Sequence, residues 1–153
     1  MNRTLEIFTD GACQGNPGEA AIGVVIREKG EQIGSISQTI GKATNNIAEY
    51  AAVIYALQEA LILKAEQVKI HTDSELLYNQ MNGSYKIKNE NLKFFYDLAR
   101  HLLKGFKKIE FQLVPREKNR EADKLATQAI QKKQAKVVAP MFSIGEESPS
   151  SAG

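Results

Sequence analysis

Two aspartates occupy matching positions in this sequence, each following a threonine at the end of an apolar segment. Asp10 follows the apolar part of LEIFTDGAC, and Asp73 does the same in VKIHTDSEL. If the two segments form adjacent parallel strands, both carboxylates lie at the carboxyl end of the sheet, where open α/β sheets bind ligands. Neighbouring carboxylates repel each other unless a divalent cation lies among them, so the pair predicts a metal site. The alternative is that each aspartate simply ends a strand at a turn.

Two further acids could complete such a site, and each also has a purely structural interpretation. Glu49, within NNIAEYAAV, lies near the start of a predicted helix and shares a stripe with Val53 and Ala56. It would instead belong to a capping box if Asn46 caps this helix. Asp123, within NREADKLA, lies at the edge of the apolar face of the last predicted helix. An acid there also complements the helix dipole, and the residues alone leave both interpretations open.

The elements that would position these acids show alternating strand and helix patterns. Apolar and β-branched residues predict strands at residues 3–10, 20–27, 31–40, 67–72 and 108–114. Apolar residues at helical spacing predict helices at residues 47–61, 74–81, 90–104 and 119–133. The turn-forming run CQGNPGE, residues 13–19, separates the first two strands. This order predicts an α/β fold with an antiparallel meander and two parallel strands reached through helices.

The composition is that of one globular domain. The chain has 153 residues, of which 42% are hydrophobic and 25% charged, with a net charge of +2, and this length can bury one core. We expect a domain over residues 1–134 and a partly flexible C-terminal tail over residues 135–153, which ends in the small and polar run GEESPSSAG. The single cysteine, Cys13, excludes an internal disulfide and fits a cytoplasmic protein. No segment has the pattern of a signal peptide or membrane helix, so we expect no membrane partner. We also expect a monomer.

Four motifs together resemble type 1 ribonuclease H. FTDGACQGNPG, TNNIAEY, HTDSE and NREADKLA occur in this order at the expected strand ends and helix starts, and the match spans residues 3–130. The resemblance implies a ribonuclease H-like fold, with a five-stranded mixed sheet flanked by helices. It also implies an endonuclease that hydrolyses the RNA strand of RNA–DNA hybrids and leaves 5′-phosphate and 3′-hydroxyl ends.

The resemblance assigns the four acids to one metal site. Asp10, Glu49, Asp73 and Asp123 match the acidic quartet of the family, which would hold two Mg²⁺ or Mn²⁺ ions about 4 Å apart. One ion would activate the attacking water and the other would stabilise the leaving 3′ oxygen. A ligand set made only of oxygens suits these cations.

The resemblance also implies substrate contacts. Asn16, Asn45 and Asn46 match positions that touch the minor groove of the hybrid, where amides can bond to 2′-hydroxyls and base edges. Thr44 and Asn89 match positions that hold a phosphate of the DNA strand. Asparagine is also a common turn and cap residue, so Asn46 could serve the helix alone.

The sequence departs from many bacterial members in two places. The loop before Asp123 reads VPREKNREAD and contains no histidine, so Arg116 or Lys118 is the nearest cationic replacement. We expect Arg116 to take part in catalysis by steadying a phosphate, since neither side chain is a base at neutral pH. A basic, tryptophan-containing extension of some relatives is replaced by NGSYKIKNEN, which predicts weaker and more salt-sensitive binding of the hybrid. His71 lies inside a strand and is expected to be packed rather than catalytic.

Other function classes fit less well. A catalytically weak nucleic-acid-binding module of the same fold is the main alternative, but a pure binder would suffer repulsion between four acids and the phosphates. The presence of four acids rather than three, and of GNPG after the first strand, argues against an integrase-like transferase. A sugar-kinase-like nucleotide binder would need two such lobes, and the sequence has no G-x-x-x-x-G-K-[ST] loop.

Overall fold

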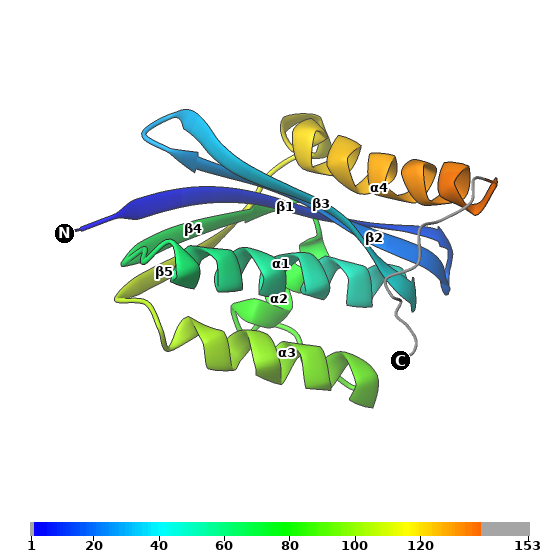
Figure 1. The fold of residues 1–153 in the computed structure, drawn as a ribbon. Helices are drawn as coiled ribbons and strands as arrows, with labels where there is room; N and C mark the ends of the chain where they lie inside the picture. Colours follow the sequence, from blue (N-terminus) through cyan, green and yellow to red (C-terminus); the bar gives the residue numbers. More distant parts are fainter. Residues whose placement is uncertain (1, 139–153) are drawn as a thin grey trace, which may run out of the picture.

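The structure is a computed structural model that describes residues 2–138, with side chains described as far as residue 133. The described chain forms a twisted sheet with helices on both faces (Figure 1). In chain order the elements are β1 (Thr4–Gly15), β2 (Gly18–Glu28), β3 (Glu31–Ala43), α1 (Asn45–Ile62), β4 (Gln67–Thr72), α2 (Glu75–Met81), α3 (Glu90–Leu103), β5 (Lys108–Leu113), the 3₁₀ helix η1 (Arg116–Lys118) and α4 (Arg120–Val138).

The sheet has the strand order β3-β2-β1-β4-β5. β1 pairs with β2 and β2 with β3 in antiparallel fashion, whereas β4 runs parallel to both β1 and β5. α4 covers one face, over β1 to β3, and α1 covers the other face, with α3 packed outside it (Figure 1). These features confirm the predicted α/β fold with a five-stranded mixed sheet.

The main core lies between the sheet and α1. Small residues let α1 approach the strands closely, and nearly every position along the middle of this helix is buried. The strands contribute branched residues from β1, β2 and β4 to the same core. Its fully buried members include Leu5, Ile7, Ile22, Val24, Ala52, Val53, Ala56, Leu57 and Ile70. This packing fixes α1 against β1, so an acid near the start of α1 has a defined position.

Strand β1 is longer than its apolar pattern predicts. The fourth strand was predicted to the residue as Gln67–Thr72, but β1 does not end at Asp10 and continues to Gly15. The reason is that β1 pairs with β2 as far as Gly15 and Gly18, so only two residues form the turn. The parallel pairing of β1 with β4, by contrast, stops at Phe8 and His71. Asp10 therefore lies just past the end of the parallel ladder, not at the end of its strand.

The predicted boundary after residue 134 stays a prediction. α4 continues through this position to Val138, and residues 139–153, most of the predicted tail, lie outside the described residues. Across residues 2–138, no helix combines the length and the apolar character that a bilayer crossing requires.

Candidate active site

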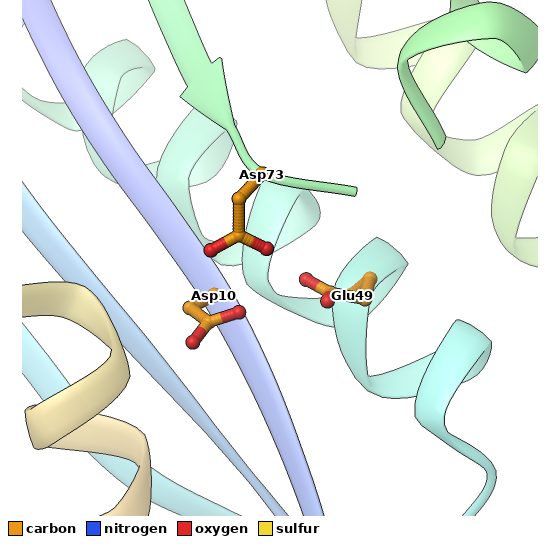
Figure 2. A group of neighbouring side chains, drawn as sticks. All are labelled: Asp10, Glu49 and Asp73. Atoms are coloured by element: carbon orange, nitrogen blue, oxygen red, sulfur yellow. The ribbon is translucent and has the colours of Figure 1, made fainter. Parts of the chain in front are cut away.

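Three of the four predicted acids meet just beyond the carboxyl end of the parallel β1–β4 ladder. Asp10 comes from β1, Glu49 from α1 and Asp73 from the segment that follows β4, and one carboxylate oxygen of each lies within 4.8 Å of the others. Their carboxylates face one another across a small gap (Figure 2). Asp10 is buried, with 5% of its surface exposed, and the other two are partly buried.

The two Thr-Asp pairs are explained by what the threonines do. β1 and β4 separate after Phe8 and His71, and the Thr9 hydroxyl donates a hydrogen bond of 3.2 Å to the carbonyl of His71 across the two strands. The Thr72 hydroxyl oxygen accepts a bond of 3.1 Å from the amide of Ser74 and so holds the turn that follows Asp73. Each threonine therefore anchors the backbone next to an acid.

Glu49 is held against β1 by a close approach of α1. A Cβ added to Gly11 would lie 2.5 Å from the backbone carbon of Ala48, so only glycine allows this contact. The amide of Gly11 donates a 3.0 Å hydrogen bond to Oε1 of Glu49, which leaves Oε2 for another partner. The capping-box alternative is wrong, because Thr44 and not Asn46 caps α1 through its Oγ1, which accepts from the amide of Ile47.

Asp123 reaches the site from the opposite face of the sheet. It is exposed and is not part of the 4.8 Å group, but it lies close enough to Asp10 to raise the pKa of that carboxyl. α4 comes this close because Gly23, the β2 partner of Asp10, has no side chain. A Cβ on Gly23 would lie 1.9 Å from the carbonyl oxygen of Ala122. The two faces of the sheet thus each deliver one helix-borne acid to the neighbourhood of Asp10.

The electrostatics of the site are those of acids crowded together. Burial, followed by the charges of Glu49 and Asp73 and the contact with Asp123, raises the pKa of Asp10 to about 9. Burial and then the charge of Asp73 raise the pKa of Glu49 to about 8, against an opposing effect of the Gly11 amide and of Arg116. Carboxyls with such raised pKa values resist ionisation unless positive charge is present.

A polar pocket of about 230 Å³ lies between the starts of α1 and α3. Its lining contains four of the predicted substrate residues and three others: Asn16, Thr44, Asn46, Ile47, Asn89, Asn91 and Leu92. Asn89 caps α3 through Oδ1, which accepts from Leu92 at 3.0 Å, so two helix N-termini meet here. Asn45 does not line the pocket, but its amide donates to Oδ1 of Asn16 at 2.9 Å.

Two residues of this region have no counterpart in the sequence prediction. Asn91 lines the pocket from the first turn of α3. The sequence offered one signal for it, namely its position two residues after Asn89, a predicted phosphate contact. Asn119 is buried and donates a 3.0 Å hydrogen bond to Oδ2 of Asp73. The sequence places Asn119 just before a helix, but an asparagine there normally indicates a helix cap. This position therefore gave no indication of the contact with Asp73.

The remaining candidates differ in their surroundings. Arg116 and Lys118 are exposed on η1, and of the two only Arg116 affects the pKa of Glu49. His71 is buried, stacks on Phe8 with ring centroids 4.2 Å apart and bonds to Glu6 at 2.7 Å. The expectation that His71 is packed is confirmed.

Comparison with known proteins settles the family. A family model described as reverse transcriptase-like matches residues 8–129. The crystal structure of RNase H1 from Halobacterium salinarum NRC-1 is 37% identical, superposes with a TM-score of 0.83, and matches over 84% of this chain and 98% of that chain. The chain belongs to the type 1 ribonuclease H family. The resemblance drawn from the four motifs is confirmed.

Other ribonuclease H relatives agree with this assignment. LC11-RNase H1, solved in complex with an RNA/DNA hybrid, is 39% identical with a TM-score of 0.80, over 85% of this chain and 99% of that chain. A bifunctional protein of Mycobacterium tuberculosis is 36% identical over 152 residues, which are 96% of this chain and 42% of that protein. This chain thus spans less than half the length of the mycobacterial relative.

The acids of this chain fit a metal site. The family is metal-dependent, and the 4.8 Å group offers oxygen atoms only. Oxygen ligands are those preferred by Mg²⁺ and Mn²⁺. The raised pKa values of Asp10 and Glu49 point the same way, because a bound cation would remove the repulsion that causes part of them.

Proposed function

We propose that this protein is an endoribonuclease that hydrolyses the RNA strand of RNA–DNA hybrids. The main support is the group of three carboxylates within 4.8 Å of one another, just beyond the end of the β1–β4 ladder. They lie in a chain of the ribonuclease H family. A relative of 39% identity binds an RNA/DNA hybrid, which supports the same substrate here.

The proposed metal ligands are Asp10, Glu49, Asp73 and Asp123, which would hold two Mg²⁺ or Mn²⁺ ions. When bound, such a pair supplies an activated water and stabilises the leaving 3′ oxygen. The protein contributes fixed ligand positions. Gly11 holds one oxygen of Glu49 and Asn119 holds one oxygen of Asp73, so each carboxylate keeps a second oxygen for a cation.

The proposed substrate contacts use donors that remain after helix capping. Thr44 and Asn89 accept helix amides through their oxygens, so the Thr44 hydroxyl hydrogen and the Asn89 amide hydrogens can donate to a phosphate of the DNA strand. Two helix N-termini add to the attraction for an anion. Asn16 likewise accepts through Oδ1, which leaves its amide hydrogens, with Asn45 and Asn46, for 2′-hydroxyls and base edges in the minor groove.

Arg116 is the proposed replacement for the loop histidine of other members. Its guanidinium is close enough to lower the pKa of Glu49, and it is always charged. We assign it to steadying the scissile phosphate or the departing product, with no role as a base.

One assay tests the function. A hybrid with labelled RNA is incubated with the protein and Mg²⁺ or Mn²⁺, with RNA duplex and DNA duplex as controls. Only the RNA strand of the hybrid should be cut, giving 5′-phosphate and 3′-hydroxyl ends, and chelator or Asp10→Asn should abolish cutting. Binding of the hybrid without cleavage would favour the alternative of a catalytically weak binding module, and cleavage by Asp10→Asn at the wild-type rate would refute the metal assignment.

A second experiment tests Arg116. Arg116→Ala should lower kcat by about 10- to 100-fold with unchanged folding, because an exposed residue contributes little to stability. Lys118→Ala, a neighbouring cation on the same 3₁₀ helix, is the matched control and should stay near wild type. Equal rates for both variants and wild type would reduce Arg116 to a surface charge.

The proposed setting is a cytoplasmic monomer. The single cysteine supports a reducing compartment. Sedimentation equilibrium of the full chain tests the monomer, and a mass of twice 16.9 kDa would contradict it.

A further inference from the structure

Asn119 is a buried polar residue whose contacts extend beyond the single bond to Asp73 used above. Only 1% of its surface is exposed, and it lies between η1 and α4. Its side-chain nitrogen donates two hydrogen bonds, to the carbonyl oxygen of Thr9 at 2.9 Å and to Oδ2 of Asp73 at 3.0 Å. These two acceptors also determine which end of the amide is nitrogen, since an oxygen in that place would face two other oxygens.

The side chain of Asn119 does not cap the helix that follows it. A capping asparagine accepts a helix amide through its side-chain oxygen, but Oδ1 of Asn119 is buried with no hydrogen-bond partner in the described part of the chain. The helix contact is made by the backbone instead, because the carbonyl of Asn119 accepts from the amide of Asp123 at 3.1 Å. The side chain is therefore committed to the acids rather than to α4.

These bonds connect Asn119 to three of the four acids. Thr9 immediately precedes Asp10, and its carbonyl lies just past the last residue pair shared by β1 and β4. The bond to Asp73 fixes one carboxylate oxygen, and the backbone bond fixes the start of the helix turn that carries Asp123. One side chain and its backbone thus set the relative positions of β1, the end of β4 and α4.

From this arrangement we infer that Asn119 is a positioning residue that orients Asp73 for metal binding. The inference rests on the proposed metal-dependent function. A hydrogen bond to one oxygen of a carboxylate restricts its rotation and directs the other oxygen, as partners of metal ligands generally do. Removing such a partner typically costs about 10- to 100-fold in metal affinity or activity.

The test compares Asn119→Leu with Gln80→Leu. Leucine has the same branched side-chain skeleton as asparagine, with bulkier methyl groups, and cannot donate, so it leaves both acceptors without a partner. Gln80 is a second buried amide, which accepts from the Tyr50 hydroxyl at 2.8 Å on the α1 side of the sheet, and its replacement controls for the loss of a buried amide. Mn²⁺ binding is measured by calorimetry, thermal unfolding in chelator, and kcat and KM on the hybrid, each well below the melting temperature.

Both variants should unfold at lower temperature than wild type. Only Asn119→Leu should weaken Mn²⁺ binding, by about 10- to 100-fold, and lower kcat with KM for the hybrid within about twofold of wild type. If Asn119→Leu binds Mn²⁺ as wild type does, Asn119 is merely structural and the inference fails. A wild-type protein that binds Mn²⁺ but cuts no hybrid would refute the proposed function and leave this comparison valid.

A measurement on the wild-type protein covers the case in which Asn119→Leu does not fold. In an NMR titration with Mg²⁺, the side-chain amide signals of Asn119 should shift with the same midpoint as the backbone amide of Asp73. The side-chain amide of Gln80 should not move and serves as the internal control. Unchanged Asn119 signals at saturating Mg²⁺ would overturn the inference.

Discussion

Asp10→Asn should stabilise the metal-free protein even though it should abolish cleavage. The pKa of Asp10 is raised to about 9 from an ordinary value of 3.8, first by burial and then by the neighbouring acids. At pH 7 the folded protein therefore keeps a proton on Asp10 that the unfolded chain would release, at a cost of about 4 kcal/mol. Asparagine has the same shape and no charge. Water and side-chain movement weaken the electrostatic repulsion in the wild type. We therefore expect Asp10→Asn to raise the free energy of unfolding by about 1–3 kcal/mol, or Tm by roughly 2–10 °C.

The gain should depend on pH. Since the folded pKa of Asp10 lies above the unfolded one, the folded state holds more protons between about pH 4 and 9, and wild-type stability falls as pH rises through that window. The asparagine variant lacks this contribution. Its advantage should grow as pH rises toward about 9 and disappear near pH 4.

Scanning calorimetry in chelator at several pH values measures this difference. Asp97→Asn is the control, because Asp97 is an exposed carboxylate that pairs with Lys93 one turn away on α3. Saturating Mn²⁺ should reverse the order of Asp10→Asn and wild type, since a bound cation stabilises the folded wild type. An advantage of equal size at pH 4 and pH 8, or a variant less stable than wild type at pH 8 in chelator, would refute the electrostatic argument.

Two further predictions concern the residues that place the helices. Gly23→Ala should cost about 1–3 kcal/mol of unfolding free energy, because the new Cβ would lie 1.9 Å from the Ala122 carbonyl oxygen. Urea denaturation against Gly34→Ala, whose Cβ would meet nothing nearer than 3.7 Å, measures this cost, and equal midpoints would contradict it. Thr44→Ala should cost about 1 kcal/mol through loss of the α1 cap and should also weaken hybrid binding, whereas Thr44→Ser should retain both. Hybrid titration checks this, and wild-type affinity of Thr44→Ala would argue against the pocket as a phosphate site.

The sequence predicted those elements whose own side chains determine their structure. Both ends of β4 were predicted correctly because β-branched residues alternate with polar ones through QVKIHT. The second half of β1 was missed because GACQG has no apolar alternation, and its strand structure depends on pairing with β2. The cap of α1 stayed open in the sequence: Thr44 and Asn46 are both good caps, and only the backbone path shows which one accepts the helix amide.

The site shows the same division. The acids could be recognised by type and by their place in the motifs, and the structure brings Asp10, Glu49 and Asp73 together. The contacts that hold them could not be read from the sequence, because they join distant residues: the Gly11 amide with Glu49, and the Asn119 amide with Asp73. From the sequence alone, an asparagine before a helix that caps the helix cannot be distinguished from one that donates a hydrogen bond to a carboxylate.

The approach of α4 to Gly23 has a consequence for how the protein is made. Asp123 is carried by the last described helix and lies near Asp10, close to the start of the chain. In the proposed site, a nascent chain that has emerged from the ribosome only as far as α3 therefore lacks one of the four metal ligands. Under the proposed function, cations would then join the first strand to the last helix late in synthesis. The backbone amides of α4 should accordingly exchange more slowly with deuterium when Mg²⁺ is present.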